Sequence, residues 1–290
     1  MKLPDGGSSA LSEIISRSLL HIQTSRELVV PARKAGEECE FEIAPGVKIV
    51  MCWIPLGEFL MGSPEDELGP WPSETQNPET QHRVMLTQGF WLGKYPVTQA
   101  QWEAVMRNNL IAFKGSNLAV ESVSWTDISE SGGFLEKVNG FAAAGEIFSL
   151  PTEAQWEYAS RAGTVTALNS GKILTKEKGA CPNLNELAWY RENSEKKIHP
   201  VGQKKANGWG LHDMHGNVWE FCSDWYGDYS NEPQVDPRGP DSGKGRVVRG
   251  GSCRSSKSGC RVAFRTFSNP AFDCYSSNVG FRIARCPFPR

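Results

Sequence analysis

Thiols, imidazoles and carboxylates are the side chains of this sequence that could take part in chemistry. The eight cysteines include no C-x-x-C pair, so their spacing indicates neither a zinc ribbon nor a thioredoxin-like redox site. His212 and His215 flank Asp213 in the string H-D-M-H, a spacing that could bring both imidazoles to one metal ion on a helix. The sequence shows no Ser-His-Asp order, no glycine loop for phosphate and no basic-aromatic stripe for nucleic acid.

The segment that contains these histidines, 207–227, must be organised by burial. Its glycines predict tight turns, and they alternate with large apolar side chains such as Trp209, Trp219 and Phe221. We therefore predict a core hairpin or a knotted loop. Polar residues lie between the apolar ones and need internal hydrogen bonds or a metal ion; they are Asp213, Asn217, Glu220 and Asp224.

Composition favours an irregular, aromatic-rich architecture over a helical bundle, because the 290 residues include 10 Trp, 29 Gly and 18 Pro. The net charge of -2 gives no electrostatic case for nucleic acid or for an anionic membrane. No run approaches the roughly 18 apolar residues of a membrane helix, and the first residues lack a signal-peptide pattern. We expect no transmembrane segment, mostly free and buried cysteines, and a cytoplasmic location by default, or surface display if a leader was removed.

The first half of the chain mixes helix and strand signals. Apolar residues recur at helical spacing in 8–28, which predicts either a partner-binding helix or a terminal helix packed on its own domain. Residues 39–51 alternate and break at Pro45-Gly46, which predicts a β-hairpin. Strands are expected over 53–63 and 82–86, separated by a long surface loop at 64–81.

Two capping boxes predict helices over 98–107 and 152–161, because each Thr stands three residues before a Gln. Between them we predict a short strand at 123–125 and a helix at 126–141 that Gly132-Gly133 weakens. Three short strand candidates follow Arg246. Helices in the middle and strands at the end predict an α+β class.

A family resemblance extends in order from about residue 45 to residue 286. It is carried by MGS (61–63), GFWLGKYPVTQAQWEAVM (89–106), LPTEAQWEYASRAG (150–163), NGWGLHDMHGNVWEF (207–221), RVVRGGS (246–252), CRVAFR (260–265) and NVGFR (278–282). These strings resemble the formylglycine-generating enzyme and sulfatase-modifying factor family. The resemblance implies a C-type-lectin-like α+β fold, loop-rich with little regular secondary structure. Residues 45–290 would form this domain, and 1–44 an N-terminal helix and lead-in strand.

The resemblance also implies, for the enzymes, oxidation of a substrate cysteine by copper held between two cysteines spaced C-x4-C after the GGS string. Here Cys253 and Cys260 follow Gly251-Ser252 with the spacing C-x6-C, so the pair is not in register. Two thiolates can bind Cu(I) at other spacings. Two hypotheses therefore remain: a copper-dependent oxidase that acts on a peptide cysteine, and a non-catalytic protein.

Calcium is a second cofactor that the resemblance implies. The Asn217 and Glu220 side chains and the Val218 carbonyl match positions that hold calcium in some relatives, and oxygen ligands suit a hard cation. Hydrogen bonds to neighbouring loops are the alternative. The resemblance places the His212–His215 string in a turn, which favours a structural role for both histidines.

Some relatives in the family are variable proteins of diversity-generating retroelements. In these proteins asparagine codons become codons for a restricted set of residues, which excludes Lys, Glu, Gln, Met and Trp. Between Arg254 and Ser277 only Lys257 falls outside that set. Aromatic and small polar residues alternate there, as in adaptable binding surfaces, and such aromatics mark an interaction site if they are exposed together. The predicted ligand-binding residues are Cys253, Arg254, Ser255, Ser256, Ser258, Phe264, Thr266, Phe267, Ser268, Ala271, Phe272, Asp273, Cys274, Tyr275, Ser276 and Ser277.

The leading hypothesis is a monomeric, non-catalytic protein that binds an unknown protein or surface ligand through residues 253–277. Residues 89–106, 150–163 and 207–226 would form a rigid scaffold, with Arg249, Trp219 and Phe281 behind the variable strands. The alternatives are the copper-dependent oxidase and an intracellular regulatory module that associates with a signalling partner.

Overall fold

The computed structural model describes residues 33–67, 79–108, 114–143, 145–175, 178–268 and 278–286. The helix predicted over 8–28 and most of the loop predicted at 64–81 lie outside these ranges. Residues Lys34–Arg290 form one compact unit.

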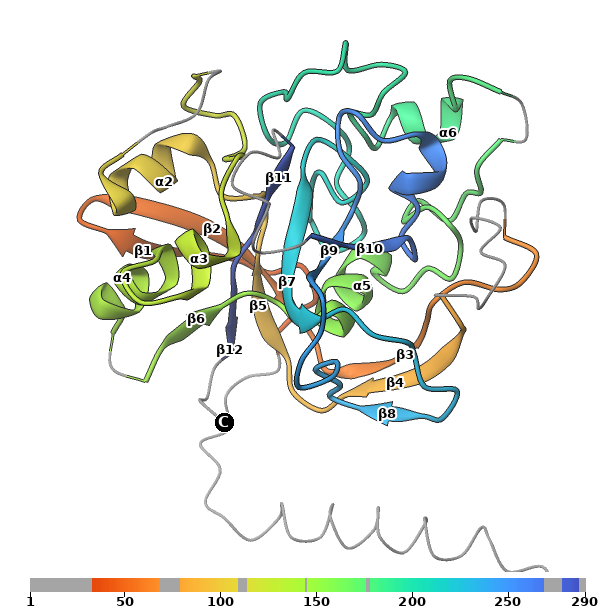
Figure 1. Ribbon diagram of the computed structural model, residues 1–290, viewed down its shortest axis with the longest axis horizontal. Coiled ribbons are helices and arrows are strands. Elements are labelled where there is room, and N and C mark those ends of the chain that lie inside the picture. The colour runs from red at the N-terminus through yellow and green to blue at the C-terminus, as the bar shows by residue number, and fades with distance from the viewer. Residues whose placement is uncertain are drawn as a thin grey trace, which may run out of the picture. The chain divides into compact units, whose positions relative to one another are not determined.

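Three sheets form the framework of this unit (Figure 1). The first, in the order β1-β2-β5-β12-β6, contains β1 (Glu38–Ala44), β2 (Val47–Ile54), β5 (Phe90–Gly93), β12 (Ala284–Cys286) and β6 (Ile147–Ser149). The second, β10-β9-β7-β11, contains β10 (Arg265–Ser268), β9 (Arg246–Arg249), β7 (Trp219–Trp225) and β11 (Val279–Gly280). The third, β3-β4-β8, contains β3 (Gly57–Met61), β4 (His82–Leu86) and β8 (Gln234–Val235).

Strand β12 lies between β5 and β6 and pairs antiparallel with both of them. Strand β11, just before it in the chain, pairs parallel with β7. The last described residues therefore join two sheets, as the edge strand β11 of the second and the interior strand β12 of the first, next to strands that are distant in the sequence.

Six helical segments lie among the described residues: α2 (Gln99–Met106), α3 (Trp125–Ser129), α4 (Phe134–Phe141), α5 (Glu153–Arg161), α6 (Pro182–Asn185) and the 3-10 helix η1 (Lys257–Cys260). The capping boxes at the starts of α2 and α5 are confirmed, since the Thr98 and Thr152 hydroxyls accept from the backbone N–H groups of Gln101 and Gln155.

Three of the predicted elements need correction. The strand predicted at 123–125 is wrong, because Ser124 caps α3 through a reciprocal pair of hydrogen bonds with Asp127. The helix predicted at 126–141 is two helices, α3 and α4, which are separated where Gly132 takes a φ of 78°. The strand predicted at 53–63 is also two strands, since Pro55 has no N–H with which to continue the β2 ladder. The hairpin around Pro45-Gly46 is confirmed as β1 and β2.

Aromatic side chains dominate the core, in which Trp156, Phe90, Phe134, Phe148, Phe221 and Phe281 are almost fully buried. Trp102 stacks on Phe134, with ring centroids 5.6 Å apart, and so joins α2 to α4. The seven cysteines among the described residues are all free, as predicted, and five of them are buried. Within the described ranges, no helix has the length and apolar character needed to cross a bilayer.

Candidate ligand-binding face

The segment 253–268 leaves β9 through two glycines and returns as β10. Gly250 and Gly251 have φ values of 90° and 77°, a region that residues with a side chain rarely adopt. A Cβ on Gly251 would lie 2.7 Å from the Cys260 Sγ, so the return of the chain leaves no space there for a larger residue. Strand β10 then pairs antiparallel with β9, from Arg265 opposite Arg249 to Ser268 opposite Arg246.

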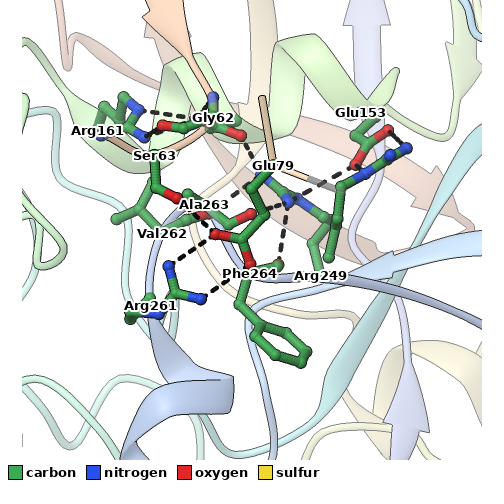
Figure 2. A network of polar contacts seen from close by, with 12 residues as sticks. Gly62, Ser63, Glu79, Glu153, Arg161, Arg249, Arg261, Val262, Ala263 and Phe264 are labelled. Atoms are coloured by element: carbon green, nitrogen blue, oxygen red, sulfur yellow. Dashed lines mark hydrogen bonds and ion pairs between the residues drawn. The ribbon is translucent and has the colours of Figure 1, made fainter. Parts of the chain in front are cut away.

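Arg249 holds this returning chain from beneath (Figure 2). Its guanidinium is fully buried and donates to the carbonyl oxygens of Ala263 at 2.8 Å, Phe264 at 2.9 Å and Val262 at 3.0 Å. It also pairs with the buried carboxylate of Glu157. Because carbonyl groups are bound rather than side chains, Arg249 fixes the path of 262–264 largely independently of which residues stand there.

Further ion pairs extend this support on both sides of Arg249. Arg261 binds the Glu79 carboxylate at 2.7 and 2.8 Å and the Glu67 carboxylate at 2.7 Å, which joins the segment to both ends of the loop at 64–81. Arg265 makes two contacts of 2.8 Å with Glu153 at the start of α5. Burial would raise the pKa of Glu153, but the charges of Arg265 and Arg249 bring it below its usual value.

The predicted site residues differ in exposure. Arg254 is exposed and Phe267 retains 47% of its accessible surface. Half-buried residues follow: Ser255, Ser256, Ser258, Phe264 and Thr266. Cys253 and Ser268 are buried. Seven residues lie outside the described ranges, and nothing tests their placement: Ala271, Phe272, Asp273, Cys274, Tyr275, Ser276 and Ser277.

Aromatic contacts position the two phenylalanines of this segment. The Phe264 ring lies 5.8 Å from that of Trp219, and the Phe267 ring lies 5.2 Å from that of Tyr226. Both partners belong to the segment 207–227, so that segment supports the face, as the sequence predicts.

Two pockets flank the turn at 253–258. The first, of about 500 Å³, has cationic side chains at its wall, namely Arg254, Lys114, Lys196 and Lys197, with Glu121 and Glu195 as the acidic ones. The second, of about 370 Å³, is lined by Ser256, Lys257, Ser258, Lys178, Arg191 and Glu192 among others. Within the described residues, Lys114, Lys196 and Arg254 form no ion pair, so their charges are available to a ligand. Sequence reasoning missed the lysines because they come from three separate loops.

The thiols of Cys253 and Cys260 are a poor fit for the copper site that the resemblance implies. Burial raises the pKa of Cys253 to about 11. Burial also raises the pKa of Cys260, which packs in an apolar cluster with Leu184 and Tyr190. Copper is bound by thiolates, and both environments favour the protonated thiol. In the described part of the chain there is also no group of three or more His, Cys, Asp or Glu side chains that could hold a metal ion.

The residues predicted for calcium are engaged with protein groups. The Asn217 side chain accepts from the His199 N–H and donates to the His199 carbonyl, both at 3.0 Å. The Glu220 carboxylate binds Arg282 at 2.6 and 2.7 Å and accepts from the Trp156 indole at 2.7 Å. A calcium ion would have to displace Arg282, so these side chains do not fit it in this arrangement.

The two histidines bind separate parts of the backbone. His215 is fully buried; its Nδ1 bonds to the Cys260 carbonyl at 2.7 Å, and its Nε2 accepts from the Asn169 N–H at 3.1 Å. Burial lowers the pKa of His215 to about 4, so its ring is neutral. His212 bonds to the Lys204 carbonyl at 2.8 Å. These contacts support the structural role expected of both.

Residues 47–287 match the sulfatase-modifying factor enzyme 1-like domain, and the chain therefore belongs to that family. The expected α+β, C-type-lectin-like fold is confirmed by this match and by the solved structures below.

Curated relatives include the formylglycine-generating enzyme of Streptomyces coelicolor, 37% identical over 58% of this chain and 52% of that protein. The mouse enzyme is 34% identical over 72% of this chain and 54% of its own length. The serine/threonine-protein kinase pkn1 of Chlamydia caviae is 33% identical over 90% of this chain and 41% of its own length. The chain thus spans about half the length of these three relatives, or less.

Among solved structures, variable protein 1 of Treponema denticola superposes with a TM-score of 0.71 and 29% identity, over 86% of this chain and 99% of that one. PvdO of Pseudomonas aeruginosa superposes with a TM-score of 0.70 at 22% identity, over 88% of this chain and all of that one, a likeness of fold.

Proposed function

We propose that this chain is a non-catalytic protein that binds another protein through a sequence-variable surface, as variable proteins of diversity-generating retroelements do. The binding surface is residues 253–277 with the cationic pocket beside Arg254. The observation that carries this proposal is the Arg249 contact with three consecutive carbonyl groups. A segment that is held by its backbone can change its outward side chains and keep its path.

Three further observations support the proposal. The Treponema denticola variable protein aligns over nearly its whole length. Arg254 and Phe267 project from a base of buried ion pairs. The unpaired cations around Arg254 would attract an acidic partner surface and accelerate its association.

The first test separates binding from catalysis. Purified protein is titrated with Cu(I) against a chelator and incubated with a cysteine-containing peptide under oxygen. We expect neither stoichiometric copper binding nor formylglycine. Stoichiometric copper that is lost in Cys253→Ala or Cys260→Ala, together with peptide oxidation, would establish the oxidase instead.

The second test concerns variability. A library randomised at Arg254, Ser256, Ser258, Thr266 and Phe267 is compared with one randomised at Val247, Val248, Val262 and Ala263, which are buried. We expect most members of the first library to unfold cooperatively near the parent temperature, and few of the second. Equal losses in both would refute a tolerant face. In the genome, a neighbouring reverse transcriptase and an adenine-rich near-copy of the 3′ end are expected.

A regulatory role is the second candidate, favoured by the extent of the kinase match. The Chlamydia caviae kinase aligns over 90% of this chain, whereas the two enzymes above align over 58% and 72%. In this case the chain would be an interaction module of a signalling protein. Co-purification of a kinase domain encoded in the same or an adjacent reading frame would distinguish it.

A further inference from the structure

A separate pocket, of about 270 Å³, lies where the end of β7, the loop that follows it, β4 and the start of α5 meet. Its described wall includes Asp224, His82, Tyr229, Met61, Gly239 and Pro240. Of the residues that line this pocket, only Arg265 also belongs to the segment 253–277, and the inference below uses neither its side chain nor the proposed function.

Asp224 presents an unpartnered carboxylate oxygen to this pocket. Its side chain is 97% buried, since only 3% of its surface is accessible. Oδ2 accepts from the Glu153 N–H at 3.0 Å and from the Ser223 hydroxyl at 2.9 Å, whereas Oδ1 receives no hydrogen bond from a described residue. Asp224 and Gly239 both line the pocket, and a Cβ built on Gly239 would lie 3.4 Å from Oδ1, so Gly239 packs beside this oxygen without giving it a donor.

His82 supplies a second acceptor. Its Nδ1 lies 3.0 Å from the Thr80 carbonyl, which can only accept, so in the neutral ring Nδ1 carries the proton and Nε2 keeps its lone pair. Among the described residues Nε2 has no hydrogen-bond partner. The ring is held edge-on against Tyr229, with centroids 4.8 Å apart, which fixes its direction.

The base of the pocket is negative once Asp224 is ionised, above about pH 7. Arg265 also reaches the wall, but its charge is balanced by two contacts with Glu153, and its guanidinium stacks on Tyr229 at 3.9 Å. Arg238 and Asp228 are exposed at the rim and balance each other in sign. Asp224 forms no ion pair with a described residue, although the charges of Arg265 and Arg246 act on it from a distance. Burial, with the nearby Glu153 charge, raises the pKa of Asp224 to about 7.

We propose that this pocket binds a primary ammonium group on an alkyl chain, which donates hydrogen bonds to Oδ1 of Asp224 and Nε2 of His82. Two acceptors, one of them a carboxylate oxygen without a donor among the described residues, suit an organic cation. The Met61 side chain and Pro240 provide apolar walls for the first methylenes.

An adjoining pocket of about 290 Å³ shares Pro237 and Arg238 and is lined by Leu86, Ile147 and Leu150. A longer alkyl chain can extend into it. Affinity should then rise about fourfold for each added methylene that leaves water.

The test uses NMR of the imidazole signals in the full chain, with n-butylammonium chloride as the probe and butanol and butyrate as controls. We expect a saturable shift of the His82 signal with butylammonium alone, while the other four histidines stay unchanged. Methylammonium should bind more weakly and hexylammonium more tightly. A response equal to that of butanol, or a linear one, would overturn the proposal.

Asp224→Asn retains an oxygen for Glu153 and Ser223 but places an amide N–H₂ in the pocket. It should weaken butylammonium binding at least tenfold, and the rim control Asp228→Asn less than threefold. If Asp224→Asn fails to fold, His82→Phe keeps the ring against Tyr229 and removes the acceptor, with the same expected loss. Unchanged affinity in a folded variant of either residue would refute the site.

Discussion

Replacing Asp224 with Asn should change how the stability of the protein depends on pH. The ordinary pKa of an Asp carboxyl is 3.8, and burial, together with the Glu153 charge, raises that of Asp224 to about 7. Between these values the folded state holds one more proton than the unfolded state. Stability from this group is therefore fully present below about pH 4 and is lost as the pH rises to about 7.

The magnitude follows from the displacement of the pKa. One proton corresponds to about 1.4 kcal/mol for each pH unit, so the wild type should lose about 3 kcal/mol between about pH 5 and pH 8 through Asp224 alone. The Asn variant has no proton to lose there, and its amide oxygen can still accept from Glu153 and Ser223. Asp213, whose pKa burial raises to about 6, and His215 contribute equally to both proteins and cancel.

Urea unfolding, followed by tryptophan fluorescence at pH values across this range, measures the effect. The free energy of unfolding of Asp224→Asn minus that of the wild type should increase by about 3 kcal/mol from about pH 5 to pH 8. A difference that is constant over the range would show that Asp224 is ionised in the folded protein at acidic pH. A difference in free energy of unfolding that decreases over this range would show that folding lowers the pKa of Asp224 instead of raising it.

Three further substitutions test the scaffold by urea unfolding at neutral pH. Arg249→Met should lower the free energy of unfolding by about 3–5 kcal/mol, because it leaves buried carbonyl and carboxylate groups unpaired. The control Arg83→Met, which removes an exposed pair with Glu58, should lower it by less than about 1 kcal/mol. Equal losses in the two variants would contradict the importance of burial. Thr152→Ala should lose about 1 kcal/mol by removing the cap of α5, and no loss would show that packing alone sets the start of that helix. Arg254→Ser should stay within about 0.5 kcal/mol of the wild type, and a larger loss would show that the exposed face is part of the structural core.

Local patterns in the sequence predicted the elements whose signals are short-range. The Thr98 and Thr152 capping boxes and the Pro45-Gly46 turn each involve residues within four positions of one another, so they can be predicted from the sequence without tertiary information. Ser124 has the same kind of signal, S-x-x-D, and the strand predicted there ignored it.

The features that define the two sites depend on contacts between residues that are distant in the sequence, so they could not be predicted from the sequence. Arg261 meets Glu67 and Glu79, which precede it by more than 180 residues, and no periodicity links them. The cations near Arg254 come together only through loop packing. The sequence indicates that Asp224 needs partners, but only the coordinates reveal that one of its oxygens has none.

The position of β12 has a consequence for how the protein is made. Leu92 of β5 pairs with Ala284, which is synthesised about 190 residues later. At ~10 residues per second, this edge of β5 stays unpaired for roughly 20 seconds during translation. That edge, Phe90–Gly93, is apolar and is a template for pairing with other nascent chains. Folding of the first sheet must therefore finish after synthesis of its last strand, and soluble yield should depend on chaperones that shield β5 during translation.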